Sequence, residues 1–271
     1  MEHDTFEAQA VTARRGRRTV LDRVSLCVQE GEVVSLLGAN GAGKSTFLSV
    51  LAGEVKPDPG PDACSALLIN ARPLCTLSAA QQARSRAVLP QIPGLGFDLA
   101  VSEVLEMGAY PFRELSAEEV GHLIRDVSDL AGIAALMHRR YVELSGGEQQ
   151  RVQFARVALQ VLANRKIDSH GRYMLLDEPT ASLDPLHQQS LMNMLVHLAR
   201  SERIGVLVIL HDVNLAARWS DRIALLSKNE IVACDTPARV LTAANLKQVY
   251  GIDVHILVHP KHPNTPLVVF D

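Results

Sequence analysis

One short motif limits what this chain can fold into more than any other feature. Residues 38–45 are Gly-Ala-Asn-Gly-Ala-Gly-Lys-Ser, which fits the G-x-x-x-x-G-K-[ST] pattern of a phosphate-binding loop. The pattern is informative between a strand and a helix, and here a β-rich run over 32–37 precedes it and a helical segment over 44–51 follows it. Backbone N–H groups of such a loop and the positive end of the helix bind phosphate oxygens. The motif therefore predicts an α/β domain that binds a nucleotide.

The side chains of the loop and an acidic pair downstream suggest phosphoryl chemistry. Lys44 is expected to place its charge between the β- and γ-phosphates, and Ser45 to offer a hydroxyl to Mg²⁺. Asp177 and Glu178 follow a predicted strand. We expect Asp177 to hold Mg²⁺ directly or through water, and Glu178 to face the attacking water. Two adjacent carboxylates could instead cap a helix, but the upstream loop favours the catalytic interpretation.

The order of apolar segments predicts a parallel sheet with helices on both faces. Residues 173–176 and 206–210 are continuous apolar runs, which suit strands covered on both sides. Two short runs over 223–226 and 230–233 predict a hairpin at the sheet edge. Helical spacing over 117–130 indicates a helical insertion within the α/β core.

Composition excludes several classes of protein. The chain has 271 residues with 27 basic and 30 acidic side chains, and a formal charge of −3 does not suit a protein that coats nucleic acid or anionic lipid. Apolar runs fall short of the roughly 18 residues that a membrane span needs. The four cysteines lack CxxC spacing, so we expect buried free thiols in a reducing compartment and neither a disulfide framework nor a zinc site.

A further motif at 144–149, Leu-Ser-Gly-Gly-Glu-Gln, indicates the family. With the loop and the Asp177–Glu178 pair, it resembles the ATP-binding-cassette ATPases over almost the whole chain. The resemblance implies a P-loop cassette with a mixed-sheet core, an N-terminal antiparallel β portion and an inserted helical subdomain. It also implies that Gln91 is the Q-loop glutamine, that 182–184 is the D-loop and that His211 is the switch histidine.

The resemblance carries a full set of site residues and partners. It implies catalytic roles for Glu178, His211 and Gln91, with Mg²⁺ held by Ser45, Gln91 and Asp177. Two cassettes of this family face head to tail, each ATP lying between one P-loop and the other signature. The Ser145–Gly147 turn, before a helix expected over 148–161, suits that second anion site. The implied nucleotide contacts are Gly38, Asn40, Gly41, Gly43, Lys44, Ser45, Thr46, Asp177, Ser145, Gly146, Gly147, Asp184 and Arg15.

One position departs from the family pattern. The aromatic residue that usually stacks on adenine is missing from 12–18, and Arg15 lies about where it belongs. A guanidinium can stack on a base. The arginines could equally form a solvated cluster at a strand edge. A nucleic-acid patch is disfavoured, because no aromatic residues are interleaved and the net charge is negative.

Several segments resemble the subfamily that powers import of iron chelates, haem and vitamin B12. They are His187-Gln188, the segment 211–222, the segment 97–111 that receives the permease, and the tail over 236–251. An extra polar loop over 164–172 favours haemin, with ferric siderophore or vitamin B12 as the alternative cargo. A non-transport cassette is a more distant alternative, since those carry tandem cassettes or long coiled-coil insertions.

These inferences predict one cassette with three parts. Residues 1–91 and 161–250 are expected to form a RecA-like core with the β portion, residues from about 92 to 160 the helical subdomain, and residues 251–271 a tail. The resemblance implies a homodimer on two transmembrane permeases at the cytoplasmic side of the inner membrane, with ATP and Mg²⁺ as cofactors and a periplasmic haem-binding protein reached through the permease. His255, His259 and His262 are expected on a surface strand and loop, because Pro260 and Pro263 interrupt any ligand spacing.

Overall fold

The computed structural model describes residues 4–58, 64, 66–91, 95, 97–165 and 170–271. Its centre is a six-stranded sheet in the order β10-β9-β3-β8-β7-β6. Neighbours are parallel except for β9 and β10, which form an antiparallel hairpin at the edge. The predicted parallel sheet and edge hairpin are confirmed. The strands are β3 (Val33–Leu37), β6 (Arg86–Leu89), β7 (Arg172–Asp177), β8 (Ile204–Ile209), β9 (Arg222–Ser227) and β10 (Glu230–Asp235).

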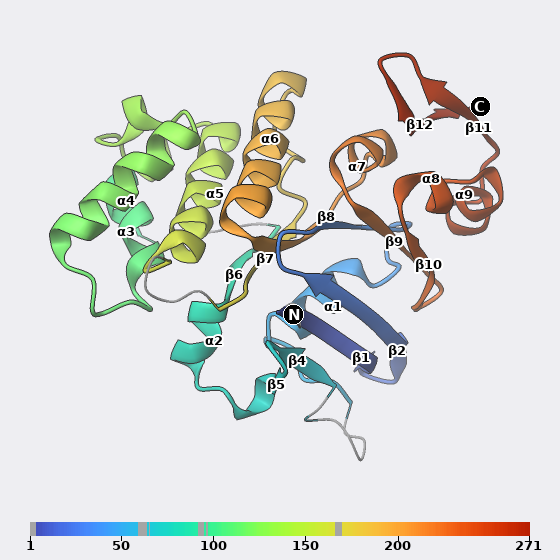
Figure 1. The fold of residues 1–271 in the computed structure, drawn as a ribbon, viewed down its shortest axis with the longest axis horizontal. Coiled ribbons are helices and arrows are strands. Elements are labelled where there is room, and N and C mark those ends of the chain that lie inside the picture. The colour runs from blue at the N-terminus through green and yellow to red at the C-terminus, as the bar shows by residue number, and fades with distance from the viewer. Residues whose placement is uncertain (1–3, 59–63, 65, 92–94, 96, 166–169) are drawn as a thin grey trace.

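A second, antiparallel sheet covers one face of the centre and confirms the predicted N-terminal β portion (Figure 1). Its strands are β1 (Thr5–Arg15), β2 (Arg18–Gln29), β4 (Leu67–Ile69) and β5 (Arg72–Pro73), in the order β2-β1-β4-β5. Its apolar side chains share one core with helix α1 (Lys44–Leu51) and with Val34 and Leu36 of β3. This core fixes α1 and the loop before it against the central sheet.

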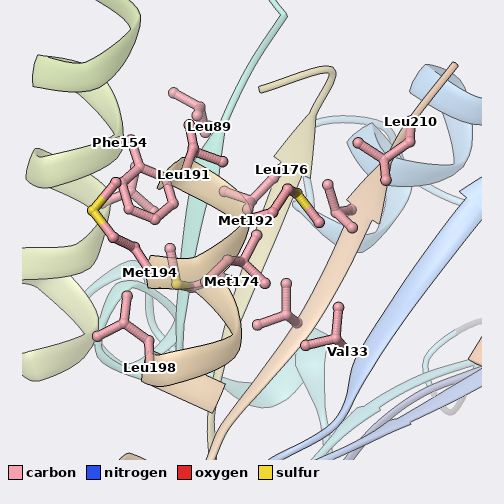
Figure 2. Close-up of a cluster of buried hydrophobic side chains, with 14 of the residues drawn as sticks. Val33, Leu89, Phe154, Met174, Leu176, Leu191, Met192, Met194, Leu198 and Leu210 are labelled. Carbon is pink, nitrogen blue, oxygen red and sulfur yellow. The ribbon is translucent and has the colours of Figure 1, made fainter. Parts of the chain in front are cut away.

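Helices cover the opposite face and extend away from it (Figure 1). Alternate residues of β3, Val33 and Leu37, point to this side, as the two-residue repeat of a strand requires. Figure 2 shows Met192 and Leu198 of α6 in one apolar cluster with Phe154 of α5 and residues of the sheet. The helices are α3 (Val101–Glu106), α4 (Ala117–Leu130), α5 (Gly146–Leu162) and α6 (Pro185–Glu202), with 3₁₀ turns at Met107–Ala109, Ala134–Leu136 and Tyr141–Glu143.

The C-terminal part ends in a hairpin that packs on α7. Asn214 of α7 joins this hairpin through its amide, which donates to the Val268 carbonyl (2.9 Å) and accepts from the Val268 N–H (2.7 Å). No helix in the described ranges is long and apolar enough to cross a bilayer. The remaining elements are α2 (Ala79–Ser85), a 3₁₀ turn at Leu74–Thr76, α7 (Val213–Trp219), α8 (Pro237–Val240), α9 (Ala243–Tyr250), β11 (Val254–His259) and β12 (His262–Phe270).

Two expectations need correction. The cysteines are not buried: Cys64 and Cys75 are exposed and paired as a disulfide, and Cys27 and Cys234 are half-buried. Sequence spacing missed the pair because turns around β4 and β5 bring its Cα atoms to 5.7 Å. Second, α5 begins at Gly146 and not at residue 148, because Ser145 already serves as its N-cap. Residues 166–169 of the predicted insertion lie outside the described residues.

Candidate active site

The phosphate-binding loop follows β3 at the carboxyl edge of the central sheet, and two of its glycines are sterically required. A Cβ on Gly38 would lie 2.3 Å from the Leu226 carbonyl oxygen of β9. A Cβ on Gly43 would lie 2.9 Å from the Val20 carbonyl oxygen of β2, and Gly43 has a φ of 108°. Glycine therefore lets the loop pass between two other strands on its way into α1.

Lys44 stabilises the curl of this loop. Its side chain is buried, and Nζ donates to the carbonyl oxygens of Gly38 (2.8 Å) and Ala39 (3.2 Å). Burial lowers the pKa of Lys44, and the nearby carboxylates of Glu178 and Asp177 oppose that change. The N-cap of α1 is Gly43, which has no side chain to accept from the first N–H groups of the helix. The loop thus presents a cation and free helix amides, which suit an anion.

Asp177 ends β7 beside this loop and has an unsatisfied oxygen. Burial raises its pKa, while a hydrogen bond from Ser45 and the charge of Lys44 act in the opposite direction. Its Oδ1 atom is buried and has no hydrogen-bond partner among the described residues. A buried carboxylate oxygen next to a hydroxyl is a donor set that Mg²⁺ accepts. The residues present therefore fit the expected divalent cation.

Three residues that follow three neighbouring strands meet, and the carboxylate of one of them, Glu178, contacts the other two. Glu178 Oε1 lies 2.5 Å from His211 Nε2, and Glu178 Oε2 accepts from Gln91 Nε2 at 2.8 Å. Gln91 follows β6, Glu178 follows β7 and His211 follows β8, and these strands are adjacent in the sheet. Glu178 has a φ of 51°, a backbone conformation that is unfavourable for a residue with a side chain and is often found at functional sites. The structure therefore brings the three predicted catalytic residues together.

A pocket of about 530 Å³ connects this trio with the loop. The predicted residues Arg15, Asn40, Gly41, Gly43, Lys44, Ser45, Thr46, Gln91, Glu178 and His211 line it, and so do Arg18, Val20 and Asn229. Its volume and its polar, cationic lining suit a nucleotide with its phosphates. The other predicted nucleotide contacts are not among the described residues that line it: Gly38, Asp177, Ser145, Gly146, Gly147 and Asp184.

The signature residues are instead placed next to the D-loop. Ser145 caps α5, with its N–H donating to Glu148 Oε2 at 2.8 Å and its hydroxyl accepting from the Glu148 N–H at 3.4 Å. A Cβ on Gly147 would lie 3.4 Å from the Ser182 carbonyl oxygen. Asp184 caps α6 by accepting from the His187 N–H at 3.0 Å. One chain therefore assembles the signature and the D-loop away from its own pocket.

Comparison with known proteins agrees with this geometry. The profile of the ABC transporter family matches residues 21–181. The chain belongs to the ABC transporter family. It is 50% identical over 265 residues to the hemin import ATP-binding protein HmuV of Bordetella avium, covering 98% of this chain and 99% of the relative. The protein of the same name from Pseudomonas fluorescens is 42% identical, covering 97% and 99%.

Solved structures show the same cassette fold. An ATP-binding subunit of an ABC transporter has a TM-score of 0.76 and 25% identity, covering 91% of this chain and 98% of that one. A dimeric bacterial ABC transporter cassette has a TM-score of 0.70 and 27% identity, covering 86% and 98%. The chain is thus an ABC-type ATPase that binds ATP and couples its hydrolysis to transport. ATPase subunits of ABC importers dimerise and work with membrane permeases.

Sequence reasoning missed three residues that line the pocket of the cassette: Arg18, Val20 and Asn229. The position of Asn229 could have been predicted from the edge hairpin. Its first strand, β9, is parallel to β3, so the carboxyl end of β9 lies at the same sheet edge as the loop. Arg18 and Val20 reach the pocket because the antiparallel sheet folds over α1, and no local sequence pattern predicts that packing. Gln188 was noted only by resemblance, and the structure shows its amide donating to the carbonyl of Thr180 (3.2 Å), two residues before the D-loop, and to that of Leu183 (3.1 Å) within it.

Proposed function

We propose that this cassette energises haemin import as a homodimer bound to two permease subunits at the cytoplasmic side of the bacterial inner membrane. A periplasmic haem-binding protein delivers the cargo through the permease. The assignment of haemin as the cargo rests on one observation. The chain is 50% identical, over nearly the full length of both chains, to a relative named for hemin import. Among the described residues, no group of three or more His, Cys, Asp or Glu side chains is placed to hold a metal ion.

The phosphate end of the pocket accounts for nucleotide binding. The loop from Gly38 to Ser45 and the uncapped N-terminus of α1 bind the phosphates, with Lys44 between the β- and γ-groups. Ser45, Asp177 and Gln91 hold Mg²⁺, which neutralises charge on the phosphates when it is bound. Arg15, which lines the same pocket, stacks on the base in place of the usual aromatic residue.

The trio at the strand ends accounts for hydrolysis. Each oxygen of the Glu178 carboxylate has a partner, His211 or Gln91, so the group is held in one orientation. Glu178 orients the attacking water and takes its proton, and His211 fixes the position of the γ-phosphate. Hydrolysis requires a second copy of the chain to supply the signature residues. Ser145–Gly147 and Asp184 are not among the described residues that line the pocket of their own chain.

The helical region, expected from about residue 92 to 160, meets the permease. Phe97 and Tyr110 support this assignment, because they are 75% and 67% exposed although both are large apolar side chains. They belong to the segment that resembles the permease-contacting part of iron-chelate importers. We propose that cargo reaches the cassette only as a change in permease conformation.

The test is reconstitution of the cassette with its own permease in lipid. Haemin, a ferric siderophore and vitamin B12 are offered in turn, each with a matching periplasmic binding protein, and ATP hydrolysis is measured. Haem-loaded binding protein should stimulate hydrolysis, and the isolated cassette should show no response to haemin. Stimulation by the siderophore complex alone would contradict the cargo but leave the ATPase assignment unaffected.

A further inference from the structure

The nucleotide pocket has a second end, away from Glu178 and His211, where Arg15 is proposed to stack on the base. In the sheet order β10-β9-β3-β8-β7-β6, the phosphate loop follows β3. Glu178 and His211 follow β7 and β8 on one side of β3, whereas Asn229 follows β9 on the other side. The pocket touches both sides. A nucleotide whose γ-phosphate lies near Glu178 therefore extends its base towards Asn229.

The walls at this second end are polar and cationic. Apart from the loop and the trio of Gln91, Glu178 and His211, the described residues lining the pocket are Arg15, Arg18, Val20 and Asn229. No aromatic side chain is among the described lining residues. A guanidinium can stack on any base, and in a bidentate arrangement it prefers guanine, so the two arginines do not select adenine. Selection for ATP has to come from another group.

The backbone of Asn229 is held in a tight turn. It forms a two-residue turn with Lys228, and both residues have positive φ, 74° for Asn229 and 48° for Lys228. Its carbonyl oxygen accepts from the Asp22 N–H at 2.8 Å, which fastens the turn to β2. Asparagine tolerates this conformation better than most residues. Asn229 therefore lines the pocket from a turn between β9 and β10 whose backbone is also hydrogen-bonded to β2.

We infer that Asn229 is the residue that makes this site prefer adenine. This inference rests on the proposed nucleotide site. A carboxamide carries one acceptor and one donor group side by side, which match the N6 amino group and N7 of adenine. Guanine presents two acceptors at the same edge, so the carboxamide satisfies only one of them. Arg15 and Arg18 then contribute base-independent stacking and charge.

The experiment compares ADP, GDP and tripolyphosphate binding by isothermal titration calorimetry. These ligands avoid hydrolysis, and tripolyphosphate reports the phosphate end alone. Asn229→Gly removes the side chain and keeps the positive φ without strain, which alanine would not. Lys228→Gly is the matched control, because it makes the same change in the same turn at a residue that does not line the pocket. A thermal melt of each variant establishes that the chain is folded.

Wild-type chain should bind ADP more tightly than GDP. Asn229→Gly should weaken ADP binding by about tenfold, the effect of losing one bidentate base contact, and leave GDP and tripolyphosphate within about twofold. Lys228→Gly should change none of the three. Unchanged ADP affinity, or an equal loss for all three ligands, would overturn the inference. If the wild-type chain binds neither ADP nor tripolyphosphate, the proposed nucleotide site is overturned as well. This outcome is seen in the wild-type chain alone, so it is distinguishable from a failure of the Asn229 inference.

Discussion

Helices α1 and α5 both begin in segments rich in glycine and small residues, but their N-termini are capped in different ways. Helix α1 starts after Gly43, whose backbone is in the left-handed region and which has no side chain to cap the helix. Helix α5 starts after Ser145, whose hydroxyl and N–H exchange hydrogen bonds with Glu148 in a complete capping box. The first turn of α1 is therefore available to a ligand within one chain, whereas part of the first turn of α5 is already satisfied.

This difference separates what one chain can do from what two must do together. The terminus of α1 lies in a pocket with Lys44, Glu178 and His211. The terminus of α5 lies beside the D-loop, and its residues do not line that pocket. A single chain thus holds the phosphate loop and the hydrolytic residues, and under the proposed function the signature of a second copy completes the site.

The largest effect is expected at the hydrolytic carboxylate. Glu178→Gln should keep ATP binding and lose hydrolysis by about 10²–10⁴-fold, the usual contribution of a positioned general base. The neutral amide also removes repulsion from the γ-phosphate, so the variant should accumulate as an ATP-bound dimer. Steady-state phosphate release and sizing with ATP would measure both effects. Glu118→Gln, an exposed change in α4, is the control, and wild-type turnover by Glu178→Gln would mean that another group is the base.

A somewhat smaller effect is expected for the cation of the loop. Lys44→Ala should weaken ATP binding by on the order of a hundredfold, because charge-assisted hydrogen bonds to phosphate are lost. The chain should stay folded, since Lys44 contacts loop carbonyls and does not belong to either apolar core. Titration calorimetry and a thermal melt check the two parts, with exposed Lys56→Ala as the control. Normal affinity, or global unfolding, would contradict the assignment.

The signature helix allows a test with a close internal match. Ser145→Ala should cost about 1 kcal/mol of unfolding free energy, because an N-cap is lost. Ser116→Ala removes the same kind of capping box from α4 and should cost a similar amount. ADP affinity should be unchanged in both variants, while hydrolysis should fall only in Ser145→Ala. An equal fall in hydrolysis in the two variants would show that Ser145 acts through stability alone.

The smallest effect concerns the cost of keeping Asp177 ionised. Because burial raises its pKa in the folded chain, the carboxylate destabilises the fold above that pKa, and the cost disappears as the pH falls through it. Without nucleotide, Asp177→Asn should therefore raise the unfolding free energy at neutral pH. Denaturation at several pH values should show this gain shrinking in acid. A gain that grows on acidification would contradict the sign, and unchanged Mg²⁺-dependence of ATP binding would contradict the role of Asp177.

The sequence predicted this fold well where local pattern and topology coincide. Strand β3 lies in the predicted β-rich run, β7 and β8 contain the predicted apolar runs, and the bounds predicted for α1 and α4 match the structure. The trio of Gln91, Glu178 and His211 was expected by resemblance, although its hydrogen bonds depend on the strand order. The bounds of the helical subdomain and the identity of the cargo stay predictions.

What the sequence did not reveal depends on contacts between distant segments. Asn229 enters the pocket because β9 pairs with β3, and Arg18 because β2 folds over the loop. The Cys64–Cys75 pair likewise arises from turns with no sequence signature. Side-chain identity predicted the phosphate chemistry, whereas the composition of the pocket walls required the tertiary structure.

Mixing of two inactive variants tests the central claim most directly. Lys44→Ala has an intact signature and Ser145→Arg has an intact phosphate loop, so a mixed dimer contains one complete site. Each variant alone should hydrolyse ATP at background rate, and the equimolar mixture should recover a clear fraction of wild-type activity. A mixture that stays at background, although both chains are folded and form mixed dimers, would contradict the account that each site is shared between two copies.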